Sequence, residues 1–161
     1  MPKSDPFDRL KQRLTAEFAL DRYSFHGPDH WQRVEGYGLY LAEQTGANIQ
    51  VVSLFAYFHD SCRQSDGDDP EHGPRAAKKV RALRSLIPLD EEAVEQLCQA
   101  CAGHTALKFS HDVTIGTCWD SDRLDLDRVG MDPHPDYMST APARLLCSYD
   151  TVSRRRLAFG K

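Results

Sequence analysis

Apolar side chains recur with a helical period along most of the chain. The first such stripe spans residues 6–19 and contains Phe7, Leu10, Leu14 and Phe18. A repeat of three to four residues places these side chains on one face of a helix. Residues 49–58 are apolar on nearly all sides, which is typical of a helix buried among others. Runs that alternate as strands do are few, so the pattern predicts an all-α fold.

Prolines, glycines and acidic residues mark where the remaining helices begin and end. Pro28 follows a turn and suits the first position of a helix that stops near Gly46. Asp69 is the expected N-cap of a later helix, and Asp90 is that of the next one. The expected helices cover residues 28–46, 70–88, 90–103 and 114–129, followed by a proline-rich loop and one short helix.

Length and charge narrow the class of protein. A chain of 161 residues suffices for one domain with a core and is short for two, so we expect a single helical bundle over residues 1–161. The formal net charge of −4 gives no reason to expect a nucleic-acid polymer as a partner. Three arginines at residues 154–156 are the local exception, and we expect them to be a solvated helix end.

The sequence carries no signal that we associate with export or membrane insertion. Its first residues lack the apolar core of a signal peptide, and no stretch is apolar enough to span a bilayer. We therefore expect a cytoplasmic protein with no membrane partner. Its five cysteines, an odd number, favour reduced thiols over a disulfide framework. Apolar residues at 157–159, expected to be exposed, would permit an oligomer.

Histidine and aspartate side chains take places on the apolar stripes of five predicted helices. His30, for example, leads a stripe that continues with Val34, Tyr37 and Leu41. Burying carboxylates and imidazoles is costly unless an opposite charge compensates them, and a divalent cation is the simplest compensation. The alternative is a helical domain without a metal site, in which the histidines are core residues with hydrogen-bond partners. The full set is His30, His59, Asp60, His72, His104 and Asp122.

Three segments within residues 24–130 resemble the HD-domain superfamily of metal-dependent phosphohydrolases. They are HGPDHWQRV, LFAYFHDSCR and WDSDRLD, and the stretch DPEHGPRAA resembles a subgroup of small bacterial members. The resemblance implies an HD-type helical bundle. It also implies four metal ligands, for the last of which Asp120 is the alternative: His30, His59, Asp60 and Asp122.

The number of metal ions and the reaction stay open at this point. Some two-metal members of the superfamily use further histidines, and His72 and His104 are placed for that. Imidazole and carboxylate ligands suit Mn, Fe, Co, Ni or Zn, and Mg less well. We expect one or two such ions to activate water for the hydrolysis of a small-molecule phosphate ester, with a nucleotide among the candidates. The alternatives are a di-iron oxygenase and a non-catalytic module that binds a nucleotide or regulates.

Several charged residues near the expected ligands are candidates for catalysis and phosphate binding. Asp60 would bind metal and also hold the attacking water. Arg63 is the first candidate for contact with the phosphate, followed by Arg33 and Arg123. For each arginine the alternative is a surface salt bridge. Glu71 is a candidate general acid or base, although its position also suits the first turn of a helix.

Overall fold

The computed structural model describes residues 4–160 of the chain, and these residues form α-helices and short 3-10 helices without a strand. The all-α prediction is therefore confirmed. None of the described helices is long and apolar enough to cross a membrane. In chain order the helices are α1 Pro6–Ala16, α2 Pro28–Thr45, α3 Ile49–Phe58, α4 His72–Ala82, η1 Arg84–Leu86, α5 Glu91–Gly103, α6 Val113–Arg123, η2 Leu126–Val129, η3 Pro135–Tyr137, α7 Ala141–Leu146 and α8 Thr151–Phe159.

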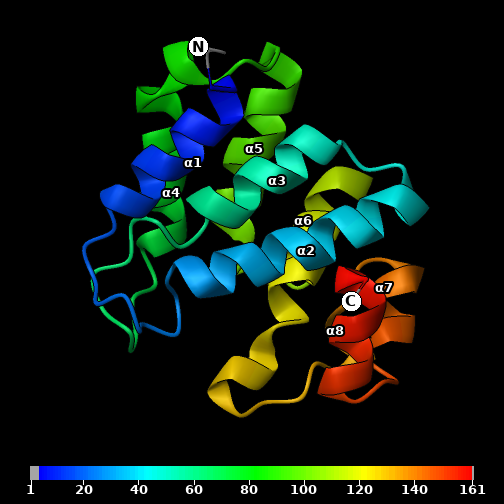
Figure 1. Ribbon diagram of the computed structural model, residues 1–161. Helices are drawn as coiled ribbons and strands as arrows, with labels where there is room; N and C mark the ends of the chain where they lie inside the picture. The colour runs from blue at the N-terminus through cyan, green and yellow to red at the C-terminus, as the bar shows by residue number, and fades with distance from the viewer. Residues whose placement is uncertain (1–3, 161) are drawn as a thin grey trace.

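Helix α3 is the centre of the bundle. It packs against α1, α2, α4, α5 and α6, and its side chains are buried or partly buried from Val51 onward, whereas Ile49 and Gln50 are exposed. Val52, Leu54, Phe55 and Phe58 are fully buried, which confirms the buried helix expected at residues 49–58. Burying each side chain of this size contributes roughly 1.5–3 kcal/mol. In Figure 1, α1, α4 and α5 gather at one end of the molecule, and α7 and α8 at the other.

Most helix boundaries follow the local signals. Helix α2 begins at Pro28 and ends before Gly46, whose φ of 77° places it in the left-handed region that glycine adopts without strain. The Asp90 carboxylate accepts the N–H of Ala93 at 2.9 Å and caps α5. In the same way the Asn48 side chain caps α3. The predictions for residues 28–46 and 90–103 are therefore confirmed within one or two residues.

Three predicted helices are shorter in the structure, and the first of them, expected over residues 6–19, ends at Ala16. The helix expected from residue 70 begins at His72, because the Asp69 carboxylate binds Arg75 and the Gln64 N–H instead of capping it. The prediction of Asp69 as N-cap was therefore wrong. The helix expected over residues 114–129 ends at Arg123, and the backbone then tightens into the 3-10 helix η2.

The C-terminal part differs most from expectation. Where one short helix was predicted, α7 and α8 follow one another. The expectation of solvated arginines was wrong for Arg154, which is only 2% exposed and donates from Nη1 to the Tyr149 carbonyl at 2.8 Å. Arg155 pairs with Asp127 at 3.0 Å. The physical reason is that α8 packs on α2, where the ring of Phe159 lies 4.9 Å from that of Tyr37. One face of α8 thus packs against the fold, where Ala158 and Phe159 are partly buried, whereas Arg156 and Leu157 are exposed as expected.

Candidate metal centre

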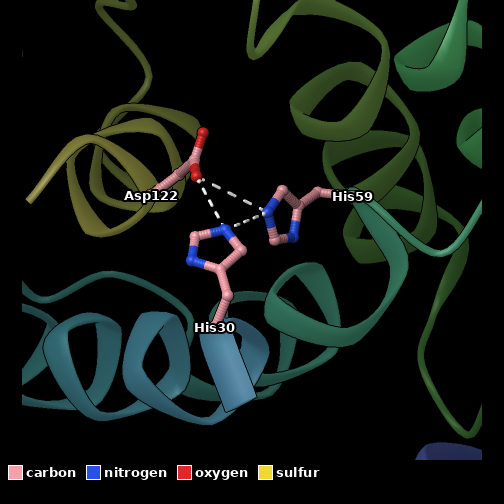
Figure 2. A group of neighbouring side chains, drawn as sticks. All are labelled: His30, His59 and Asp122. Atoms are coloured by element: carbon pink, nitrogen blue, oxygen red, sulfur yellow. Dashed lines mark hydrogen bonds and ion pairs between the residues drawn. The ribbon is translucent and has the colours of Figure 1, made fainter. Parts of the chain in front are cut away.

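Three side chains from segments that are far apart in the sequence point toward one another in the interior of the bundle (Figure 2). His30 lies in the first turn of α2, His59 directly follows α3, and Asp122 lies in the last turn of α6. The His30 Nε2 atom lies 3.2 Å from both His59 Nε2 and Asp122 Oδ1. His59 Nε2 lies 3.5 Å from the same Asp122 oxygen. These three atoms therefore surround one point, as the ligands of a metal ion do.

A second group of potential ligands lies beside the first. His72 is the first residue of α4, and His104 directly follows α5. Their Nε2 atoms are 2.9 Å apart, and they lie 3.2 Å and 3.6 Å from Asp60 Oδ1. All three side chains are buried. Asp60, His72 and His104 therefore form a second cluster that could hold a metal ion.

The carboxylate of Asp60 joins the two groups. Its Oδ1 atom faces His72 and His104, whereas Oδ2 lies 3.4 Å from His59 Nε2 and 3.6 Å from His30 Nε2. Each oxygen therefore belongs to a different cluster. The structure thus brings together the four ligands that the resemblance implied and the two additional histidines considered for a second ion.

Hydrogen bonds at the opposite ring nitrogen orient each of these histidines. His59 and His104 direct Nδ1 at backbone carbonyls 2.7–3.1 Å away, and His72 directs Nδ1 at the Asp69 carbonyl. His30 directs Nδ1 at the Asp125 carboxylate, 2.8 Å away. An imidazole that donates from Nδ1 presents a lone pair at Nε2, which is the form that binds metals. Two lone pairs that face each other across about 3 Å repel, so either a proton or a metal ion between them would stabilise this arrangement.

The spacing of the ligand atoms fits a divalent transition metal. Nitrogen and oxygen ligands lie about 2.1 Å from such ions, so neighbouring ligand atoms are about 3.0 Å apart in octahedral and about 3.4 Å apart in tetrahedral coordination. The contacts within the two groups range from 2.9 to 3.6 Å. The nitrogen and oxygen donor set and its spacing therefore both suit the metals expected from the sequence.

The electrostatics of the centre favour positive charge. Burial opposes ionisation of Asp60 and Asp122, yet the surrounding imidazoles hold the pKa of both carboxyl groups well below the usual range. Burial also opposes a charged His59, but these two carboxylates raise its pKa to about 10. Burial lowers the pKa of His104. The paired carboxylates thus attract either a proton or a metal ion to the space between them.

A cavity of about 710 Å³ opens over the centre. Its volume lies in the range of sites for small molecules. Its floor includes Asp60, His104, Asp122 and His26, whose Nδ1 lies 3.2 Å from Asp60 Oδ2. The cavity therefore gives a small molecule access to both groups of ligands.

The predicted phosphate contacts lie in different places. Arg63 lines the cavity, with Nε 3.3 Å from Asp60 Oδ1. Arg123 also lines it, but Nη1 and Nη2 donate to the backbone carbonyls of four residues and are occupied in holding two loops. Arg33 lies outside this cavity, and its Nε donates to the Asp125 carboxylate at 2.8 Å. Glu71 is exposed and does not line the cavity. Of these four residues, only Arg63 combines a cavity position with a contact to the side chain of a candidate ligand.

Asp120, the alternative to Asp122, is turned away from the centre. Its carboxylate accepts hydrogen bonds from the Ser139 N–H and from both the N–H and the hydroxyl of Thr140, at 2.7–2.8 Å. Asp120 therefore fastens the segment after η3 to α6. The two aspartates, only two residues apart, thus have separate roles.

Sequence reasoning missed three charged residues of the site. Asp125 does not share the apolar stripe of Asp122 in the sequence, but the change of backbone at the start of η2 places its carboxylate 2.8 Å from His30 Nδ1. Arg128, whose Nη2 lies 3.8 Å from Asp122 Oδ1, and Lys108 both line the cavity. The repeated acids of WDSDRLDLDR were a signal for Asp125, whereas no sequence pattern distinguished Lys108 or Arg128 from other basic residues.

Comparisons of the chain with protein-family models, with curated proteins and with solved structures found no match.

Proposed function

We propose that this protein is a metal-dependent hydrolase that cleaves a phosphate ester of a small molecule. One observation carries the proposal. A single carboxylate, that of Asp60, is shared between two histidine-containing clusters at the floor of a cavity that is also lined by basic side chains. The resemblance of three segments to the HD-domain superfamily points to the same chemistry, because the residues quoted for it are those that converge.

In this proposal the ligands divide into two sets. Asp60 Oδ2 completes the group of His30, His59 and Asp122, and Asp60 Oδ1 completes the pair of His72 and His104. Bound divalent ions would activate water as a nucleophile and polarise a phosphoryl oxygen. We therefore favour two ions over one.

The other cavity residues would bind and orient the substrate. The guanidinium groups of Arg63 and Arg128 flank the two carboxylates, at 3.3 Å from Asp60 and 3.8 Å from Asp122. Both also donate to backbone carbonyls, but Nη2 of each makes no hydrogen bond within the described residues and suits a phosphate oxygen. Lys108 adds a positive charge further out. Attack of water on phosphorus breaks the bond to the ester oxygen, which must then receive a proton. His26 lines the cavity against Asp60 and takes the place of Glu71 as our candidate for that proton transfer.

A di-iron oxygenase is the second candidate, because two nitrogen and oxygen ligand sets that share a carboxylate also suit a pair of iron ions. The two functions differ in what they consume. A hydrolase releases phosphate without oxygen, whereas an oxygenase takes up dioxygen.

The decisive experiment combines metal analysis with a test of turnover. The purified chain would be reconstituted separately with Mn²⁺, Co²⁺, Zn²⁺ and Fe²⁺ and assayed for phosphate release from para-nitrophenyl phosphate and a panel of phosphate monoesters. We expect about two metal equivalents and hydrolysis with at least one metal. His59→Ala would lower both, whereas His111→Ala, which alters an exposed histidine away from the centre, serves as the matched control.

Three results would contradict the proposal. Failure to bind metal after reconstitution would make the histidines ordinary core residues. Oxygen uptake by the iron form without phosphate release would favour the oxygenase. Tight nucleotide binding by a metal-loaded protein that releases no product would favour a regulatory module.

A further inference from the structure

Large apolar side chains that are left exposed gather around the cavity over the metal centre. Leu107, Val129, Met131 and Tyr137 all line it, and each is 40–58% exposed. They come from two separate segments, the loop after α5 and the stretch from η2 to η3. Exposed apolar side chains concentrated in one place mark a surface that a ligand covers.

The large exposed apolar side chains line the outer part of the cavity, together with Asp132 and His134. Next to the carboxylates of Asp60 and Asp122 stand Arg63 and Arg128, so the floor is charged. On the wall, the Lys108 ammonium group lies 4.8 Å from the centre of the Tyr137 ring and shares that wall with apolar groups. A ligand that matches this division has one anionic end and one apolar body.

We propose that the substrate is a phosphate monoester whose alcohol part is an alkyl or aryl group, with its phosphate at the metal centre and its apolar body against Leu107, Val129, Met131 and Tyr137. This inference rests on the proposed function for the position of the phosphate. A chain of phosphates would need cations along the whole cavity, whereas four of the exposed residues that line its outer part are large and apolar and Asp132 adds a negative charge there. The volume of about 710 Å³ leaves room for such a body beyond the phosphate.

Alkylphosphonates have a P–C bond in place of the ester P–O bond, so the enzyme cannot hydrolyse them. Their binding therefore tests the apolar wall without turnover. Calorimetry would compare methylphosphonate with hexylphosphonate on the Mn²⁺-loaded protein. Burial of one methylene strengthens binding about fourfold, so burial of two or more gives hexylphosphonate an advantage of at least about tenfold. Adenosine monophosphate, which carries a polar body on the same phosphate, is expected to bind more weakly than hexylphosphonate.

Variants assign the advantage to the wall. Leu107→Ser and Val129→Ser would reduce the ratio of the two phosphonate affinities to about threefold or less. Both side chains are exposed, so the core is left intact. Leu145→Ser is the matched control, because Leu145 is 61% exposed on α7 and lies outside the cavity, and the ratio is expected to stay as in the unaltered protein.

The results separate this inference from the proposed function. Equal affinities for the two phosphonates, or tighter binding of adenosine monophosphate, would overturn the apolar substrate and leave the metal centre standing. Methylphosphonate binding that persists unchanged after metal removal would instead refute the position of the phosphate and, with it, both proposals.

Discussion

Asp125 offers the sharpest test of how the protein supports its metal centre. Its carboxylate is fully buried, accepts from His30 Nδ1 at 2.8 Å and from Arg33 Nε at 2.8 and 3.0 Å, and lies 3.4 Å from Arg155. Among the four histidines of the centre, His30 is the one whose Nδ1 atom is hydrogen-bonded to a carboxylate within the described part of the chain, whereas Nδ1 of the others faces backbone carbonyls. A negative partner makes an imidazole a stronger ligand.

The substitution Asp125→Asn keeps the size of the side chain and removes its charge. Loss of such a partner behind a metal-binding histidine typically lowers metal affinity about 10–100-fold, which corresponds to about 1.4–2.7 kcal/mol. Arg33 and Arg155 would lose a counter-charge, but both are partly exposed and Arg155 keeps its contact with Asp127. We therefore expect the loss mainly at the cluster containing His30, with about one metal equivalent retained.

Competition with a chromophoric chelator measures this loss. Titration with Co²⁺ would follow the two sites separately by their absorption, for Asp125→Asn beside Asp127→Asn. The control removes a charge that also pairs with Arg155, but Asp127 has no contact with His30 in the described structure. If Asp125→Asn binds both ions as tightly as the control does, then the carboxylate does not tune His30 and the reasoning fails.

Three further predictions follow from the core and from the charge of the centre. Removal of metal with a chelator is expected to lower the melting temperature by several degrees, because a ligand that binds only the native state stabilises it. Circular dichroism measures this change, and an unchanged melting temperature would contradict a bound ion. Gly38→Ala would place a Cβ atom 2.4 Å from Val52 Cγ1, so urea unfolding should show a loss of about 1–3 kcal/mol, with Glu43→Ala on the exposed face as control. In metal-free protein the pKa of His59 is raised to about 10, so His59 carries a proton at pH 7.5 that the metal must displace. Calorimetry in two buffers of different ionisation enthalpy should therefore report proton release, and identical apparent enthalpies would contradict it.

The helices could be predicted from sequence because their signals are local. A stripe of apolar residues, a proline at the first turn and a glycine after the last are all contained within a single segment, as in α2 from Pro28 to Gly46. The candidate ligands were found for the same reason. His30 and Asp122 stood at places on a helix that face the core, where a polar side chain needs a partner.

Residues whose roles depend on other segments could not be predicted in this way. Arg154 is buried because α8 packs against α2, and a run of arginines contains no sign of that contact. Asp125 reaches His30 only after the backbone changes from an α-helix to a 3-10 helix, which alters the period on which face assignments rest. Arg33 lies one turn after His30 yet points to Asp125 instead of the cavity. Proximity in sequence to a ligand was therefore a poor guide to phosphate contacts.

The six candidate ligands come from α2, α4 and α6 and from the residues that directly follow α3 and α5. Opening of any one of these helices would remove a ligand, so a bound ion resists local unfolding in all of them at once. At about 100 times its dissociation constant, a metal ion adds about 2.7 kcal/mol to this resistance. Amide hydrogen exchange should therefore slow together in the five helices when metal is supplied, whereas α1, which contributes none of these ligands, should exchange at its own rate. Through this coupling, metal supply in the cell would set how long the folded chain survives proteolysis.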